Sequence, residues 1–260
     1  MIKRLTIATL AMLSIGVATA NASTIFLIGS DVISFHDDVE FINPVMDQLG
    51  NTGTKKILFL SDSVSSVNYT AGNVTFDFKP YSFLTSSVSL TPYSGVYADS
   101  PSTCCSDPGP QLAAFGGGTN LANYVAAGGN LGVGNYQANA FWNTALGFVG
   151  GGVTSGAPSA TCVDPGVSTA SGILFGFKPS YSEGCFVHQT YSPTFWASHG
   201  FFALQTNGAA GATFGDFVTM ASGFIEPGTT PSAVPEPASV GLLGLGLVGV
   251  VAGLRRRRRQ

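Results

Sequence analysis

The octapeptide DVISFHDD, which begins at Asp31, gathers three carboxylates and one imidazole in a short stretch. It follows the apolar run STIFLI, which predicts a buried strand. In open α/β sheets, ligands and catalytic groups lie at the carboxyl ends of strands. Carboxylate oxygens suit calcium, so Asp31, Asp37 and Asp38, with His36 beside them, are candidate ligands of a divalent cation. The alternative is that Asp37 caps a helix and that His36 is a loop residue.

Two further histidines, His188 and His199, lie eleven residues apart in an aromatic-rich part of the chain. A histidine pair can act in acid–base catalysis if a carboxylate assists it, and Glu183 and Asp216 are the nearby carboxylates. The alternative is that both histidines are polar residues at the edge of an aromatic core.

Three aromatic residues of the same region, Tyr181, Tyr191 and Trp196, offer a different chemistry. Exposed aromatic rings present flat apolar faces on which a sugar can stack. Such a platform would make the protein a carbohydrate-binding module, whereas buried rings would belong to the core.

The segments that position these residues alternate between strand and helix patterns. Residues 56–60 (KILFL) are a second apolar run, and residues 39–49 have helical apolar spacing. Asp37 as the cap, with Glu40 three residues on, predicts the start of this helix, and Pro44 predicts a kink or a restart. Strand, helix and strand in this order form a βαβ unit and imply a parallel sheet.

The same alternation continues over the next part of the chain. Residues 93–98 predict a strand, the second half of residues 110–127 predicts a helix, and residues 130–134 predict another strand. Residues 217–221 predict a final strand, and several aromatic residues after position 150 supply core. We therefore expect an α/β body with a doubly wound, mostly parallel sheet. The alternative is an all-β sandwich, which the glycine-, serine- and threonine-rich composition allows.

The element order, with the phrases SGVYAD and NYVAAGGNLGVG, resembles the class I glutamine amidotransferase-like fold of flavodoxin type over residues 23–150. In that family a cysteine nucleophile occupies the turn after the strand that corresponds to residues 130–134. The turn here reads Gly134-Asn135-Tyr136, and the chain contains no GxSxG motif. The resemblance therefore implies the fold without its catalytic residue, and we expect no cofactor.

The amino terminus has the pattern of a secretory signal peptide. Lys3 and Arg4 precede a mostly apolar run over residues 5–18, and Ala20-Asn21-Ala22 fits the small-x-small cleavage pattern. We predict a signal peptide over residues 1–22 and cleavage after it, so that the exported protein begins at residue 23.

The carboxyl terminus combines a short apolar run with a basic cluster. Residues 238–254 are 17 uncharged residues, about 26 Å of helix, which is near the lower limit for spanning a bilayer. A linker with the motif PEP, residues 229–237, precedes this predicted transmembrane helix. The tail over residues 255–260 would stay in the cytoplasm because arginines resist translocation; these are Arg255, Arg256, Arg257, Arg258 and Arg259.

These three parts in this order resemble the PEP-CTERM sorting signal, and the resemblance covers residues 234–260. It implies that an exosortase-type membrane protease recognises Pro235, Glu236 and Pro237. It also implies a Gram-negative, exopolysaccharide-producing source. The protein would be anchored transiently in the inner membrane and then reach the cell surface or the extracellular space.

The exported body, residues 23–228, has an acidic balance that the terminal arginines conceal. Residues 23–234 carry 13 acidic side chains against four lysines, a net charge of −9. This charge argues against nucleic acid and anionic membrane surfaces as partners. The abundance of glycine, serine, threonine and asparagine suits a polysaccharide-filled environment, which makes exopolysaccharide a candidate partner.

The four cysteines of the chain fall in this exported body, where the environment favours disulfides. Adjacent cysteines rarely bond each other because the ring is strained. We therefore expect Cys104 and Cys105 each to bond one of Cys162 and Cys185.

We interpret the chain as an exported surface or extracellular-matrix protein with a non-catalytic body. One alternative is an exported hydrolase that uses the Asp31–Asp38 stretch or the His188/His199 region, and another is a carbohydrate-binding module. Convergence of His188, His199 and a carboxylate within hydrogen-bond reach in one cleft would favour the enzyme, whereas an open row of aromatic rings would favour glycan binding. Neither arrangement would favour a structural role.

Overall fold

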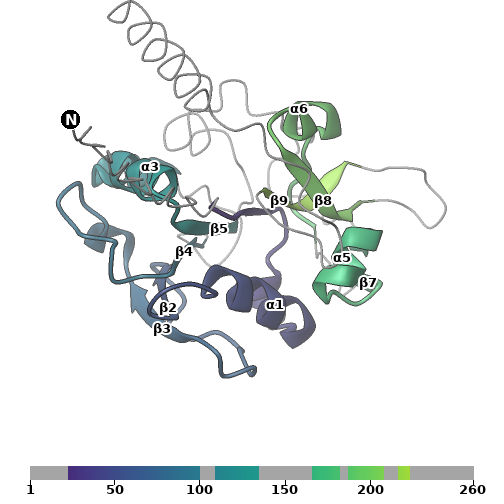
Figure 1. Cartoon of the computed structure of the whole chain (residues 1–260), viewed down its shortest axis with the longest axis horizontal. Coiled ribbons are helices and arrows are strands. Elements are labelled where there is room, and N and C mark those ends of the chain that lie inside the picture. Colours follow the sequence, from purple (N-terminus) through teal and green to yellow (C-terminus); the bar gives the residue numbers. More distant parts are fainter. Residues whose placement is uncertain (1–22, 100–108, 135–165, 182–186, 208–215, 223–260) are drawn as a thin grey trace, which may run out of the picture. The chain divides into compact units, whose positions relative to one another are not determined.

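The computed structural model describes residues 23–99, 109–134, 166–181, 187–207 and 216–222. Within these residues, nine strands form one sheet in the order β3-β2-β4-β5-β1-β9-β8-β6-β7 (Figure 1). The strands are β1 (Ile25–Ile28), β2 (Lys56–Leu60), β3 (Thr75–Lys79), β4 (Gly95–Ala98), β5 (Asn130–Gly134), β6 (Gly166–Ser168), β7 (Ser180–Tyr181), β8 (Phe201–Thr206) and β9 (Phe217–Ser222).

The sheet is mixed, with a parallel half and an antiparallel half. Strands β3, β2, β4, β5 and β1 pair in parallel. From β1 onward every pairing is antiparallel, beginning with Ile28 of β1 opposite Thr219 of β9. The predicted α/β class is confirmed, and the all-β alternative is wrong. The prediction of a mostly parallel sheet is wrong as well, because half of the strand pairings are antiparallel. The reason is that the chain after β5 adds its strands as antiparallel neighbours beside β1.

Helices cover both faces of the parallel half. The remaining elements are the π-turn η1 (Val32–His36), the 3₁₀ turn η2 (Tyr81–Phe83), and the helices α1 (Val39–Leu49), α2 (Gly109–Ala114), α3 (Gly117–Ala126), α5 (Ala170–Phe175) and α6 (Pro193–Ser198). Helix α1 connects β1 to β2, and helices α2 and α3 connect β4 to β5. They pack against separate clusters of buried residues, so this half is doubly wound.

The two clusters follow from the two-residue period of the strands. In β1, Ile25 and Leu27 pack with Leu121 of α3, whereas Phe26 and Ile28 pack with residues of α1 such as Phe41. All four β1 residues are buried, which is why the run reads as continuously apolar.

Helix α1 begins one residue later than the capping pattern predicted. The side chain of Asp38, not that of Asp37, accepts a hydrogen bond from the Glu40 N–H at 3.0 Å. Asp37 instead has a left-handed backbone with φ of 51° and ends η1. Pro44 lies inside the helix, which runs unbroken to Leu49.

The other predicted strands and the helix before β5 are confirmed within one or two residues. Strands β3, β6, β7 and β8 and helices α5 and α6 were not predicted. No helix among the described residues is long and apolar enough to cross a membrane. The predicted signal peptide, transmembrane helix and arginine tail, the four cysteines and Asn135 all lie outside the described residues.

Candidate functional site

A cluster of buried polar side chains lies at the carboxyl end of β1. Asp31 follows this strand and is only 4% exposed. Its Oδ1 lies 3.1 Å from Nε2 of His36, and its Oδ2 lies 3.1 Å from Nε2 of His188. One carboxylate therefore contacts two imidazoles, which come from η1 and from a segment more than 150 residues farther along the chain.

The π-turn η1 brings His36 back toward Asp31. The Phe35 N–H donates to the Asp31 carbonyl oxygen at 2.9 Å, which closes the turn around the aspartate. Single π-turns are rare, and those that occur are often found at functional sites. The His36 side chain is 17% exposed, so it is the more accessible of the two imidazoles; the His188 side chain is 5% exposed.

The segment that carries His188 crosses the end of β1. The N–H groups of His188 and Gln189 both donate to the Gly29 carbonyl oxygen, at 2.8 and 2.9 Å. A Cβ atom at position 29 would lie 2.1 Å from the Gln189 carbonyl oxygen, so only glycine allows this approach. Ser30 and Val187 form an isolated antiparallel bridge beside it. The backbone therefore fixes His188 against Asp31.

A second buried carboxylate, Asp99, follows β4 at the same edge of the sheet. Asp99 is 1% exposed, and its Oδ1 accepts a hydrogen bond from the Ser34 hydroxyl of η1 at 3.0 Å. The Tyr81 hydroxyl donates to the Asp99 carbonyl oxygen. The residues after β1 therefore reach across to the end of β4, and both carboxylates are buried beside η1.

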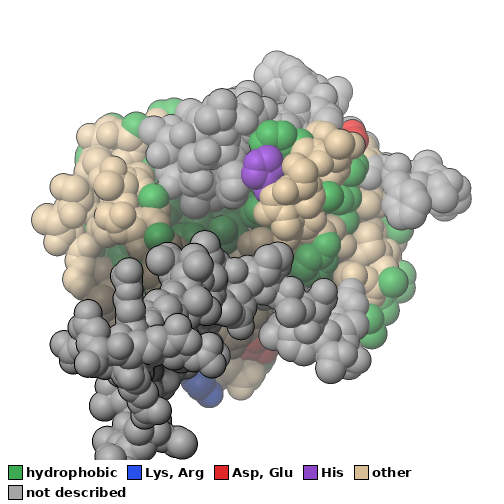
Figure 2. All heavy atoms as spheres, turned by 45° about the horizontal axis from the view of Figure 1, so that its top comes forward, with side chains coloured by type: hydrophobic (Ala, Val, Ile, Leu, Met, Phe, Trp, Pro, Cys, Tyr) green, Lys and Arg blue, Asp and Glu red, His purple; other side chains and the backbone are tan. Residues whose placement is uncertain are grey.

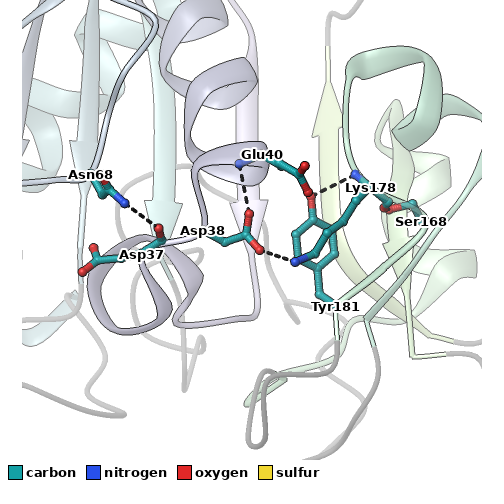
Figure 3. Close-up of polar contacts among 7 residues, drawn as sticks. All are labelled: Asp37, Asp38, Glu40, Asn68, Ser168, Lys178 and Tyr181. Carbon is teal, nitrogen blue, oxygen red and sulfur yellow. Dashed lines mark hydrogen bonds and ion pairs between the residues drawn. The ribbon is translucent and has the colours of Figure 1, made fainter.

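Asp37 and Asp38 contact residues outside this cluster (Figure 3). The Asp37 carbonyl oxygen accepts a hydrogen bond from the Asn68 amide at 2.9 Å. The Asp38 carboxylate pairs with the Lys178 ammonium, which also lies 4.5 Å from the centre of the Tyr181 ring. The structure therefore separates Asp38 from Asp31. No group of three or more His, Cys, Asp or Glu side chains in the described part of the chain is arranged to hold a metal ion.

The pairing of His188 with His199 is not observed. His199 is exposed, its ring stacks on Phe195 at 4.4 Å between centroids, and its Nδ1 lies 2.8 Å from the Phe195 carbonyl oxygen. His188 instead contacts the same carboxylate as His36, a residue of the other predicted site. The spacing of the histidines along the chain gave no signal for this combination.

The alternative of an exposed sugar-stacking platform at these three aromatic residues is wrong. Tyr181, Tyr191 and Trp196 are all fully buried, and Tyr191 and Trp196 pack edge to face with ring centroids 5.9 Å apart. Rings that water cannot reach cannot stack on a sugar. These side chains belong to the core, as the alternative reading held.

A surface groove lies between the first half of helix α1 and residues 176–178. It has a volume of about 340 Å³, and it is lined by Val39, Glu40, Asn43, Pro44, Gly176, Phe177 and Lys178. Two of the polar groups at its wall are occupied: the Asn43 amide bonds Thr70, and the Lys178 ammonium pairs with Asp38.

Charged side chains are sparse on the surface. On the face drawn in Figure 2, neutral polar and hydrophobic side chains cover most of the described surface. Lys56 and Lys79 both lie 3.2 Å from Asp77 at the β3 edge. Burial raises the pKa of Asp77, but hydrogen bonds from Tyr93, Lys79 and Lys56 outweigh it and hold the pKa below its usual value. Of the four lysines in the part of the chain that the structure describes, three are therefore paired with carboxylates other than Asp31.

A family model described as the PEP-CTERM protein-sorting motif matches residues 233–258. The chain carries a PEP-CTERM sorting motif. This motif indicates an exported protein that an exosortase processes and that is sorted to the cell surface. The match agrees with the resemblance seen in Pro235-Glu236-Pro237 and covers only the carboxyl terminus. Searches of curated proteins and of solved structures found no match to the chain.

Proposed function

We propose that this chain is a surface or extracellular-matrix protein of a Gram-negative bacterium that makes exopolysaccharide. The match of residues 233–258 to the PEP-CTERM motif is the observation that carries this proposal. The body has few charges, an acidic balance and a glycine- and serine-rich composition, all of which suit a hydrated polysaccharide matrix. Exopolysaccharide is therefore its proposed partner.

The tail serves as a temporary anchor in this proposal. The arginines at 255–259 resist translocation and stop residues 238–254 in the inner membrane. Pro235 and Pro237 lack backbone N–H groups and disfavour helix, which keeps the motif extended outside the bilayer. The exosortase can then reach Glu236 and its neighbours and process the protein.

Replacing Pro235-Glu236-Pro237 by three alanines tests this function. We expect the variant to remain full-length in the inner membrane, whereas the wild-type protein is processed and reaches the cell surface. A matched control replaces Thr229 and Thr230, which lie outside the motif, by alanine and should be processed normally. Immunoblots of fractionated cells measure both outcomes. Processing of the triple-alanine variant at the wild-type rate would refute the proposal.

The body should also contain two disulfides, each joining Cys104 or Cys105 to Cys162 or Cys185. Alkylation of the exported protein without prior reduction should leave all four cysteines unlabelled, and mass spectrometry after proteolysis should recover cross-linked peptides. A labelled cysteine in the folded, exported protein would contradict this expectation.

A further inference from the structure

The convergence of His36 and His188 on Asp31 is a chemical feature that export does not require. The Asp31 and His188 side chains are each 5% exposed, and burying ionisable groups of this kind costs free energy even when they are paired. The cluster also lies at the carboxyl end of β1 in the doubly wound half of the sheet, where open α/β sheets bind ligands. Its location and chemistry together indicate a site that acts on a ligand.

We propose that Asp31, His36 and His188 form an acid–base site that hydrolyses an uncharged carboxylic ester. His36 is the catalytic residue because its side chain is the more exposed of the two imidazoles, 17% against 5%. Asp31 is a positioning residue that contacts the His36 imidazole and would stabilise the imidazolium form. His188 is a second positioning residue, which contacts the opposite oxygen of the same carboxylate.

The reaction needs only water as its second reactant. His36 takes a proton from water as the water oxygen attacks the acyl carbon, and the carbonyl π electrons move to the carbonyl oxygen. The tetrahedral intermediate then collapses, the acyl–oxygen single bond breaks, and the imidazolium returns the proton to the departing alkoxide. The products are a carboxylic acid and an alcohol, and no oxidant, reductant or further group is consumed.

The surroundings favour an uncharged ester over other substrates. Three of the four lysines in the exported body are engaged elsewhere, two with Asp77 and Lys178 with Asp38, so they are not available to bind an anionic substrate. Glycoside hydrolysis uses a pair of carboxyl groups as acid and nucleophile or base. Here the Asp31 carboxylate contacts two imidazoles, and Asp99 accepts a hydrogen bond from Ser34. Imidazole as the acid–base group fits ester cleavage better.

The chain offers its own control, because its third histidine lies outside the cluster. 4-Nitrophenyl acetate, an uncharged ester, is the probe for full-length protein purified from the envelope of a host that exports it. The wild-type rate should exceed that of an equal concentration of free imidazole at least hundredfold. His36→Gln should lower kcat by about 10²–10⁴-fold, the range typical of general acid–base groups. His199→Gln should change kcat less than twofold.

The pH profile separates the catalytic residue from the positioning residue. The wild-type rate should rise with pH, because only the neutral imidazole of a general base can accept the proton. His188→Gln should lower kcat about tenfold or more but retain this rise, whereas His36→Gln should lose it. Circular dichroism of each variant checks that the fold is kept.

Two results would overturn the proposal. One is a folded wild-type protein whose turnover does not exceed that of free imidazole, which decides the question even if a variant fails to fold. The other is equal activity in His36→Gln and His199→Gln. Neither result bears on export, because the sorting assay reports on residues 235–237 alone.

Discussion

His188→Ala should be the most destabilising single change among the three histidines. The substitution removes an imidazole that is almost fully buried and that lies 3.1 Å from a carboxylate oxygen of Asp31. The backbone hydrogen bonds from this segment to Gly29 remain possible, because they involve main-chain atoms only. The lost free energy therefore reports on the side chain and on the buried carboxylate that it leaves behind.

The structure sets the size of the expected effect. Loss of an interaction with a charged group is worth about 1.5–3 kcal/mol, and a buried carboxylate deprived of a partner adds to this. Asp31 keeps its contact with His36, which limits the penalty. We expect His188→Ala to lower the free energy of unfolding by about 2–4 kcal/mol. His36→Ala should cost about 1–2 kcal/mol because this side chain is three times more exposed, 17% against 5%.

Urea denaturation followed by tryptophan fluorescence measures these differences, and Trp196 in the core is a suitable probe because it is fully buried. His199→Ala is the matched control and should change stability by less than about 0.5 kcal/mol, since its ring is exposed. Combining His188→Ala with Asp31→Asn should give a coupling energy of about 1 kcal/mol or more. The reasoning fails if His188→Ala is as stable as His199→Ala, or if the two changes at Asp31 and His188 are additive.

Three other perturbations test separate contacts. Burial and the hydrogen bond to Asp77 raise the pKa of Tyr93 to about 12, so its contribution is present below about pH 10 and is lost toward pH 12. Tyr93→Phe should therefore make the free energy of unfolding, measured by urea denaturation, fall less steeply with pH over that range. An unchanged dependence on pH would contradict this. Lys178→Met breaks the pair with Asp38 and should cost about 1 kcal/mol in the same assay, because both side chains are partly exposed. Gly29→Ala places a methyl group 2.1 Å from a backbone carbonyl and should destabilise by about 2 kcal/mol or more, and a neutral effect would show that the crossing segment is loosely held.

Local patterns were sufficient to predict four of the five strands in the parallel half of the fold, but not β3. Strand β2 appears in the sequence as a short continuous apolar run, and helix α1 appears as apolar residues at helical spacing. Both patterns can be recognised from residues that are close together in the chain. The N-cap of α1 was misplaced by one residue because Asp37 adopts a left-handed backbone at the end of η1. Nothing in the capping pattern distinguishes Asp37 from Asp38 as the cap; the π-turn that precedes them decides it.

The antiparallel half and the candidate site depend on contacts that no local pattern encodes. Strand β9 was predicted as an element, but its place in the middle of the sheet depends on pairing with β1, almost 200 residues earlier in the chain. Asp31 and His188 are 157 residues apart, and they meet because the crossing segment bonds the Gly29 carbonyl. The Gly-Ser-Asp sequence after β1 predicted only a turn. Its glycine is needed for close backbone approach, and this approach places one histidine of the aromatic-rich region against the carboxylate of the first strand. Each of the two candidate sites predicted from the sequence therefore contained part of the cluster, and only the fold brings the two parts together.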